Sequence, residues 1–524
     1  MSNKRKGEND NDVSSKYTKI VDQVSDEVFE ELNQNTLKKL VLSFEKKYNN
    51  NQEMRLKYSK QPEKSSKTIN NFKIDYYKKT RFMDSEIELY EEIKKLQIIA
   101  TAPELYPLFI KLGSVTSLGS LLLHDNTDIV IDTIDLFQEL TAQESPTQDE
   151  SLSLTNSIFE NGILEVLVQQ TFDKLECSNP DEQQAVHNIL NIFENLLEVK
   201  PLETSKILVD KSNVFKYILD TISNKSTPLP IRLYCCEILS IILQEYEESR
   251  TEFGKKDGIE RLLIVISAYK KKSPESLEES EMVENIFSSL CSCLFNHRKN
   301  KELFIKSEGI ELMLLFIKNK TTLRSSALKV FNYALSDDRV CCERFVDQLG
   351  LKTLFSSLMK KVKSKHNKKV YNESEDEEHI ITTIFSLLFN LEKRSERYNR
   401  VVSKFTENQF EKIDRCFELI DKYTKRLVAL ENDLKQEEDE YDEDELFLKR
   451  IDADTSMKQK NISKNNIRQV LIEYRDGLDD TTEEKRKQID YIRVSNQMKR
   501  EKPNQLDIYM HTFILNINMT ITSK

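Results

Sequence analysis

The sequence is short of the residues that interrupt helices. Its 524 residues include only 9 glycines and 10 prolines. Both residue types are enriched where regular elements end, because proline lacks a backbone donor and glycine tolerates unusual dihedral angles. Their scarcity argues against a fold built from many tight turns and favours a largely helical chain. With 38% hydrophobic and 32% charged residues, the composition suits helices that each bury one apolar stripe.

Long hydrophobic runs are also missing. The first residues, "MSNKRKGENDND", lack the apolar segment of a secretory signal, and no later run reaches the roughly 18 apolar residues that span a bilayer. The eight cysteines form no C-x-x-C pair and no regular framework. We therefore expect a protein that is neither secreted nor membrane-bound, with reduced thiols.

The motifs of common enzymes are absent. The sequence contains no Walker loop, G-x-G-x-x-G, H-E-x-x-H or G-x-S-x-G, and its six histidines are scattered. We predict that the protein is not an enzyme and needs no cofactor. The alternative would require a composite site assembled from residues distant in sequence.

One short stretch, "HDNTD", resembles a metal site because His124, Asp125 and Asp128 lie close together. Zinc needs three or four preorganised ligands, and no further histidine or cysteine lies at a suitable spacing. The alternative is a corner between helices, in which Asp125 caps the second helix and Asp128 follows as in a capping box. We favour the corner and predict no metal.

The cysteine doublets have a similar structural explanation. Adjacent residues on a helix point about 100° apart, so doublets such as "YCCEI" and "VCCER" cannot readily close on one metal. Cys291 shares a face with Phe287 and Leu294 and is expected to be a core thiol.

The strongest signal is an internal repeat. A small or polar residue, an aliphatic residue and a helix recur about every 40–50 residues, which is the armadillo and HEAT range. The phrases are "LGSVTSLGSLL" (Gly113), "ENGILEVLVQQ" (Gly162), "KSNVFKYILDTI" (Asn213), "KDGIERLLIVI" (Gly258), "SEGIELMLLFI" (Gly309) and "QLGLKTLFSSL" (Gly350). We expect these glycines to adopt the left-handed turn that ends a helix. A long amphipathic helix follows each phrase, and neighbouring repeats must cover its apolar face.

This pattern predicts an all-α fold, an armadillo/HEAT-like right-handed superhelix of helical repeats with a helical N-terminal extension. Four segments are expected in order along the chain. They are a disordered N-terminus over 1–25, N-terminal helices and a polar connector over 26–78, the repeat array over 79–430, and an acidic linker with a divergent tail over 431–524.

Charge is unevenly distributed in a chain whose formal net charge is −11. An acidic chain suits basic peptides better than nucleic acid, so we expect no direct nucleic-acid binding. Lys4, Arg5 and Lys6 form a candidate nuclear localisation signal, as does the run from Lys360 to Lys369, although basic runs are usually only solvated. The acidic run over 437–445 is either a tether for basic partners or a solvating linker.

Asparagines late in the long helices are candidate peptide-binding residues. They are Asn195, Asn332 and Asn390, with Glu194 and Glu198 beside the first of them. In an armadillo array the last helix of each repeat can offer an amide to the backbone of an extended peptide. The competing interpretation is a solvated or locally bonded amide. Nuclear-import adaptors of the importin-alpha type pair such asparagines with a tryptophan ladder, which a chain without tryptophan cannot form.

Several phrases together resemble the beta-catenin-like protein 1 family. They occur in that family's order between Phe44 and Ala453. Among them are "FEKKYNNNQEMRLKY", "PELYPLFIKLGSVTSLGSLLLHDNTDIVIDTIDLFQELT", "VHNILNIFENLLE", "LYCCEILSIILQ", "RSSALKVFNYAL" and "ELFLKRIDA".

The resemblance implies a nuclear protein with an armadillo-like array that associates with the spliceosome. It implies membership of the nineteen complex and binding of the localisation segment of that complex's Myb-type splicing factor. The prediction is therefore a non-enzymatic scaffold in pre-mRNA splicing that binds basic localisation peptides. A karyopherin-like nuclear transport adaptor is the alternative, and a homodimer is a further candidate assembly.

The C-terminal part departs from the family pattern. After "FLKRIDA" the chain continues into the polar "DTSMKQKNISKNN", and only "IRQVLIEYRDGL" then resembles the family's last helix. Because the end of a solenoid must be capped, we expect the stretch from Phe410 to Leu430 to be under-packed, with a partner or second copy covering it.

Overall fold

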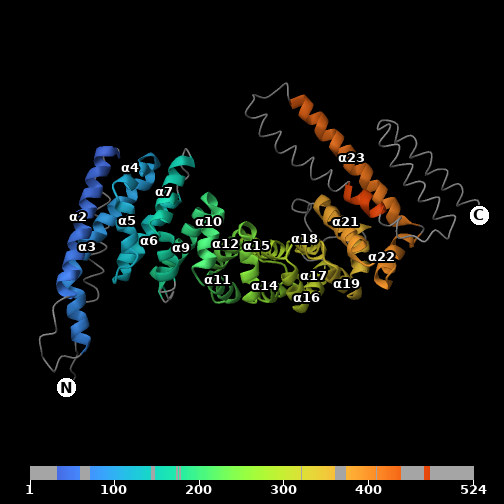
Figure 1. Cartoon of the computed structure of the whole chain (residues 1–524), viewed down its shortest axis with the longest axis horizontal. Helices are drawn as coiled ribbons and strands as arrows, with labels where there is room; N and C mark the ends of the chain where they lie inside the picture. The colour runs from blue at the N-terminus through green and yellow to red at the C-terminus, as the bar shows by residue number, and fades with distance from the viewer. Residues whose placement is uncertain are drawn as a thin grey trace, which may run out of the picture. The chain divides into compact units, whose positions relative to one another are not determined.

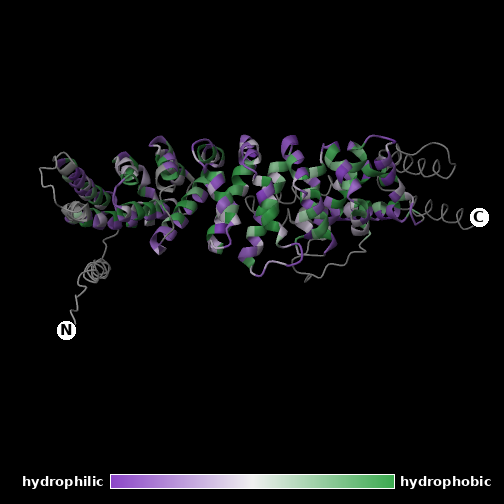
Figure 2. Ribbon diagram, turned by 90° about the horizontal axis from the view of Figure 1, so that it is seen from below, coloured by the Kyte–Doolittle hydropathy of each residue, from purple (hydrophilic) through white to green (hydrophobic). Residues whose placement is uncertain are grey.

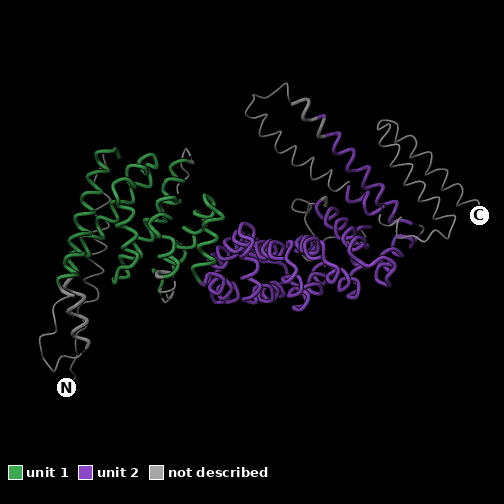
Figure 3. The backbone as a smooth tube through the Cα atoms, viewed as in Figure 1, with its two compact units in different colours: residues 1–212 green, residues 213–524 purple. Residues whose placement is uncertain are grey.

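The computed structural model describes residues 32–59, 71–142, 148–172, 175, 179–319, 322–359, 373–408, 410–437 and 465–472. Every regular element in these ranges is a helix (Figure 1). The chain divides into two compact units, residues 1–212 and residues 213–524 (Figure 3). The predicted all-α, armadillo-type fold is confirmed.

Unit 1 begins with two long helices, α2 and α3, followed by shorter helices in sequence. Their bounds are α2 Gln34–Ser59, α3 Asn71–Leu96, η1 Gln97–Thr101, η2 Pro103–Leu105, α4 Tyr106–Lys111, α5 Ser114–Leu121, α6 Thr127–Thr141, α7 Gln148–Glu160, α8 Ile163–Val166, η3 Leu167–Phe172, α9 Pro180–Val199 and α10 Pro201–Asp210. Helix α6 packs on both α3 and α9, so these three helices form one layer.

Unit 2 repeats a three-helix motif. Its helices are α11 Val214–Ser223, α12 Leu229–Glu245, α13 Glu247–Lys255, α14 Gly258–Ser267, α15 Leu277–Leu294, α16 Arg298–Lys306, α17 Gly309–Lys318, α18 Arg324–Leu335, α19 Arg339–Asp347, α20 Gly350–Leu358, α21 Glu373–Asn390, α22 Glu396–Thr406 and α23 Glu411–Glu437. The third helices α12, α15, α18 and α21 pack in that order, as do the second helices α11, α14, α17 and α20. Stacking of equivalent helices is the arrangement of a solenoid.

The core runs along the interior of each stack. Helices show hydrophobic and hydrophilic residues on different sides, as expected of elements that bury one face (Figure 2). The core contains both aliphatic side chains and aromatic rings. Four of the fully buried rings are those of Phe137, Phe193, Phe253 and Phe304. Burial of one such ring contributes about 1.5–3 kcal/mol relative to exposure.

The prediction that the repeated glycines are left-handed is only partly right. It concerns the turn between the first and second helices of each repeat, such as the turn between α13 and α14. Gly113 and Gly162 adopt the expected left-handed conformation, with φ of 85° and 64°. In unit 2 the residue before the glycine takes that conformation instead, namely Asp257, Glu308 and Leu349, with φ of 56°, 58° and 61°.

The glycines of these three turns are needed for close packing. Gly258, Gly309 and Gly350 each begin a second helix and lie against a phenylalanine ring five residues earlier. A Cβ atom would come within 2.5 Å of the Phe253 ring at Gly258 and within 2.6 Å of the Phe345 ring at Gly350. Glycine is therefore required by close packing rather than by its own backbone angle.

At three places a buried polar side chain joins a long helix to the helix that follows it, namely α9 to α10, α12 to α13 and α15 to α16. Thr204 donates to the carbonyl of Leu196 at 3.0 Å, and Ser249 donates to that of Ile242 at 3.1 Å. The amide of Asn300 donates to the carbonyl of Cys293 at 2.8 Å. The bond to Cys293 serves a carbonyl in the last turn of α15, whereas the carbonyls of Leu196 and Ile242 also accept a bond from the backbone N–H four residues later.

The C-terminal end of unit 2 is packed, so the predicted under-packing is wrong. Cys416, Leu419 and Tyr423 of α23 are at most 2% exposed. A short helix over 465–472 buries further apolar residues, and its Asn466 donates to the Thr382 hydroxyl of α21 at 3.2 Å. This helix coincides with the start of the stretch that resembles the family's last helix.

The predicted limits of the repeat array fall inside helices. Residue 79 lies within α3 and residue 430 lies within α23.

Candidate functional site: an acidic helical face

A stripe of carboxylates follows helix α6. The helix begins at Thr127, where the Asn126 side chain accepts a hydrogen bond from the Asp128 backbone. Asp128, Asp132, Asp135 and Glu139 then recur at steps of four, three and four residues, which places them on one side of the helix.

Helix α3 supplies a cation to this stripe. The Lys94 ammonium lies 3.1 Å from an Asp132 oxygen and 3.9 Å from an Asp135 oxygen. The amide of Gln97, just after α3, donates to Glu139 at 3.1 Å. Burial alone would lower the pKa of Lys94, but the two aspartates outweigh it and the pKa is raised.

Helix α9 meets the same stripe with amide side chains. Asn188 donates to Asp135 at 2.7 Å and accepts from Gln184 at 2.9 Å. One end of the helix carries Glu194 and Glu198, of which Glu194 is half-buried and Glu198 exposed. We call the carboxylates of α6 and α9 the acidic face. It consists of Asp128, Asp132, Asp135, Glu139, Glu194 and Glu198.

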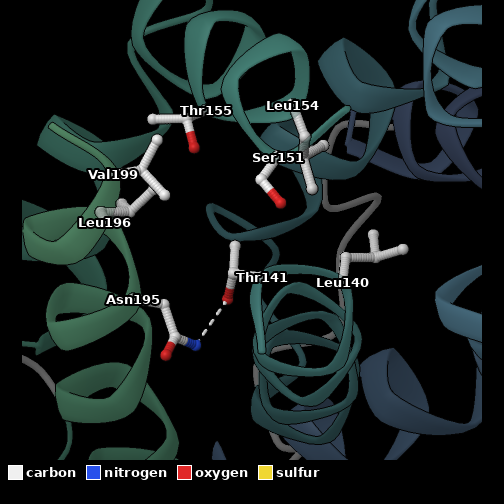
Figure 4. Close-up of a pocket in the computed structure, with 8 residues that line it drawn as sticks. All are labelled: Leu140, Thr141, Ser151, Leu154, Thr155, Asn195, Leu196 and Val199. Atoms are coloured by element: carbon white, nitrogen blue, oxygen red, sulfur yellow. Dashed lines mark hydrogen bonds between the residues drawn. The ribbon is translucent and has the colours of Figure 1, made fainter. Parts of the chain in front are cut away.

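Asn195 lies where α9 approaches the end of α6 (Figure 4). Its amide donates to the Thr141 hydroxyl at 3.2 Å. Both residues line a small pocket with about 230 Å³ of empty space, part of it open to solvent. The other lining residues are Leu140, Ser151, Leu154, Thr155, Leu196 and Val199.

Charge compensation on the acidic face is uneven. The Lys94 ammonium pairs with Asp132 and Asp135, and burial raises the pKa of Asp132 to about 6, with further contributions from Asp135 and Asp128. Burial, followed by the charge of Glu198, raises the pKa of Glu194. Burial also raises the pKa of Glu139. A second cation placed on this face would therefore be stabilised.

The structure brings together some predicted residues and separates others. Glu194, Asn195 and Glu198 share the end of α9 beside α6. Asn332 and Asn390 lie in unit 2, on the packed helices α18 and α21. The Asn390 amide donates to the Leu335 carbonyl at 3.0 Å, which matches the locally bonded interpretation for that N–H.

The carboxylate stripe of α6 was missed by the sequence prediction. The acidic residues of "TDIVIDTIDLFQEL" recur at steps of three and four residues, so the stripe is visible in the sequence itself. The pairing of Asn188 with Asp135 joins residues 53 positions apart, so the sequence alone gave no signal for it.

The "HDNTD" stretch is the corner between α5 and α6, and its polar groups are used locally. The His124 Nδ1 accepts from the Asn126 backbone at 3.1 Å, so its Nε2 donates to the Asn51 oxygen at 3.2 Å. Asp125 pairs with Arg55 of α2 at 2.8 Å. The predicted cap at Asp125 is therefore wrong, because Asn126 caps α6 and Asp125 instead ties α2 to the corner.

The cysteines of the described ranges are core residues. All seven are buried free thiols, and burial raises the pKa of both Cys291 and Cys416 to about 12. Across the described part of the chain, no group of three or more histidine, cysteine, aspartate or glutamate residues is arranged to hold a metal ion.

The predicted charged segments lie outside the residues that the structure describes, except for one residue of the acidic run. Lys4, Arg5 and Lys6, the basic run over 360–369 and nearly all of the acidic run over 437–445 lie outside the described residues. In the portion that the structure covers, no helix is long and apolar enough to cross a membrane.

Comparison with known proteins gives consistent results. The family model described as "Catenin-beta-like, Arm-motif containing nuclear" matches residues 15–461. The beta-catenin-like protein 1 of Homo sapiens is 37% identical over 436 residues, covering 80% of this chain and 73% of the relative. Its homologue in Schizosaccharomyces pombe is 34% identical over 422 residues, covering 79% and 69%.

A solved structure agrees at the level of fold. The crystal structure of an engineered protein covers 82% of this chain and 95% of its own, with a TM-score of 0.50 and 13% sequence identity. Together with the family match and the identity to the two relatives, this leads to one conclusion: the chain is a member of the catenin-beta-like, Arm-motif-containing nuclear family.

Proposed function

We propose that this protein is a nuclear, non-enzymatic scaffold in pre-mRNA splicing that binds basic localisation segments of splicing proteins. The family to which it belongs is described as nuclear and Arm-motif-containing. The resemblance described above implies association with the nineteen complex and its Myb-type splicing factor. The observation that carries the binding proposal is the acidic face of unit 1.

The chemistry of that face suits lysine and arginine side chains. Asp132 and Glu194 are partly withdrawn from water, and burial raises the pKa of each carboxyl group. An ammonium or guanidinium group about 4 Å from such a carboxylate gains about 4 kcal/mol of Coulomb energy, before desolvation costs are subtracted. Micromolar binding corresponds to about 8 kcal/mol, so a ligand segment must make several such contacts side by side.

The layer α3, α6 and α9 also supports a stable binding surface. Its carboxylates are held by bonds to Lys94, Gln97 and Asn188 on both neighbouring helices. A surface fixed before binding loses little conformational entropy when the ligand arrives. The loss of conformational entropy then falls mainly on the ligand, which becomes ordered as it binds. This is typical when a disordered basic segment binds a folded array.

The experiment is a titration of a labelled lysine- and arginine-rich peptide with the full chain, read by fluorescence anisotropy. The test variant neutralises four carboxylates of the acidic face: Asp135→Asn, Glu139→Gln, Glu194→Gln and Glu198→Gln. The control variant neutralises four exposed carboxylates of unit 2: Glu248→Gln, Glu260→Gln, Glu278→Gln and Glu281→Gln.

We expect the test variant to lose at least about tenfold in affinity, corresponding to about 1.4 kcal/mol, and the control to lose much less. Equal losses would show that overall charge, rather than this face, binds the peptide. For the cellular role, purification of the tagged protein from nuclei should recover spliceosomal proteins. Recovery of importin-beta with diverse cargo would favour the transport adaptor instead.

A further inference from the structure

Exposed aromatic rings gather on the third helices of unit 2. Phe295, at the end of α15, is 46% exposed, and Phe389 of α21 is 55% exposed. The Phe295 ring meets Tyr333 of α18 edge-on, with centroids 5.9 Å apart. The Phe385 and Phe389 rings lie 5.5 Å apart. We call these four residues the aromatic row.

The two aromatic pairs belong to directly packed helices. Helix α15 packs on α18, and α18 packs on α21. Asn390, the neighbour of Phe389, reaches the carbonyl of Leu335, two residues beyond Tyr333. On α21, Thr382 contacts Asn466 one turn before Phe385, so the helix over 465–472 bounds the row on that side.

The charge around the row differs from that of the acidic face. The Arg250 guanidinium lies 5.9 Å from the Phe295 ring centroid and is held by the carbonyls of Leu243 and Gln244. A basic ligand would be repelled by this fixed positive charge. The row therefore disfavours a basic ligand.

Proline complements such rings. The faces of aromatic rings carry partial negative charge, and the C–H groups next to the proline nitrogen carry partial positive charge. Proline-rich segments adopt the polyproline II helix, and aromatic-lined grooves bind them with little loss of entropy. Asn332, beside Tyr333 and partly exposed, offers an amide to a backbone carbonyl of the ligand.

The spacing of packed helices also matches the distance between prolines on one side of a polyproline II helix. Packed helices have axes about 8–10 Å apart. A polyproline II helix advances about 3.1 Å per residue with three residues per turn, so prolines three residues apart lie on one side at about 9.3 Å. We propose that the aromatic row binds a proline-rich segment in the polyproline II conformation, with prolines at positions i and i+3 seated on Tyr333 of α18 and Phe389 of α21, two adjacent packed helices.

The test is a titration of a fluorescein-labelled ten-residue proline peptide with the full chain, read by anisotropy. We expect saturable binding, and we expect Phe295→Ala and Phe389→Ala each to weaken it about tenfold, as hot-spot aromatic residues do. Because both rings are about half exposed, the thermal unfolding midpoint of each variant should match that of the parent. The matched control is Ile264→Ala, an apolar residue of α14 that is 63% exposed and lies among the second helices.

A peptide in which alanine replaces every second proline breaks the i, i+3 spacing and should bind more weakly than one in which alanine replaces every third. No saturable binding, or an equal loss from Ile264→Ala, would overturn the proposal. Competition by a lysine-rich peptide as strong as that by the proline peptide would also overturn it. The variant with a neutralised acidic face should bind proline peptide normally, so failure here is distinguishable from failure of the proposed function.

Discussion

The turn between α19 and α20 permits a sharp test of why glycine recurs in the repeats. Leu349 has the left-handed backbone, with φ of 61°, and its side chain is 65% exposed. Gly350 follows it and lies against the ring of Phe345. Two substitutions at adjacent positions should therefore change stability in opposite directions.

Replacement of Gly350 by alanine should destabilise unit 2. The new Cβ atom would lie 2.6 Å from two atoms of the Phe345 ring. That ring is 1% exposed and packs edge-on against Phe331 at 5.0 Å, so it has no space into which to move. Overpacking of a core in this way costs about 1–3 kcal/mol.

Replacement of Leu349 by glycine should stabilise the same unit. A left-handed conformation costs a residue with a Cβ atom about 1–2 kcal/mol. Glycine removes that cost and loses about 0.5–1 kcal/mol through the greater freedom of the unfolded chain. Because the leucine side chain is mostly exposed, little burial is lost, and the net gain should be about 0.5–1 kcal/mol.

The assay is thermal unfolding of the full chain, followed by calorimetry. For a unit of this size, a change of 1 kcal/mol shifts the midpoint by about 2–4 °C. Gly113→Asn in unit 1 is the control, because asparagine tolerates a positive φ and no atom would lie within 4 Å of its Cβ. A neutral Gly350→Ala combined with a destabilising Leu349→Gly would refute the packing explanation.

Three further predictions concern individual side chains. Asn300→Ala should lower the stability of unit 2 by about 1–3 kcal/mol, because the Cys293 carbonyl at the end of α15 loses its hydrogen bond from the Asn300 amide, as measured by urea unfolding. Affinity for a basic peptide should rise between pH 5 and pH 7, because the bound cation favours the ionised form of Asp132, whose pKa is raised to about 6. In Asp132→Asn that rise should largely disappear, and an unchanged profile would exclude Asp132 from the binding face. Burial and Arg55 lower the pKa of His124 to about 4, so the unfolded chain binds the proton more readily and stability should fall as pH drops from 6.5 to 4. His124→Gln should show a weaker dependence over that range in thermal unfolding, and equal slopes would contradict the assignment.

Much of the fold was predictable because it rests on local patterns. The 3.6-residue periodicity marks the third helices, and the repeat of about 40–50 residues identifies the array. The burial of Cys291 also followed from its position beside Phe287 and Leu294. Each of these features depends on neighbours within one helix or one repeat.

Features that depend on packing between elements were harder to predict. In the unit 2 turns the left-handed residue precedes a glycine that lies against a phenylalanine ring, as at Phe304 and Gly309. The recurrent phenylalanine five residues before glycine, in "FGKKDG", "FIKSEG" and "FVDQLG", was a signal available in the sequence. The contact of residues 465–472 with α21 could not be predicted from helical periodicity alone.

The candidate site shows the same division. The acidic residues beside Asn195 were identified from sequence, whereas the packing of α6 on α9, which places the α6 stripe beside them, depends on contacts between residues distant in sequence. Asn390 illustrates the opposite case, because its amide bonds the end of the neighbouring helix α18.

The central claim is that the acidic face of unit 1 binds basic localisation segments. The most direct test is photo-crosslinking of a lysine- and arginine-rich peptide to the full chain, followed by mass spectrometry of the adducts. We expect adducts within α6 and α9, residues 127–141 and 180–199. They should diminish when Asp135, Glu139, Glu194 and Glu198 are neutralised. Adducts confined to unit 2, or unaffected by the neutralisation, would contradict it.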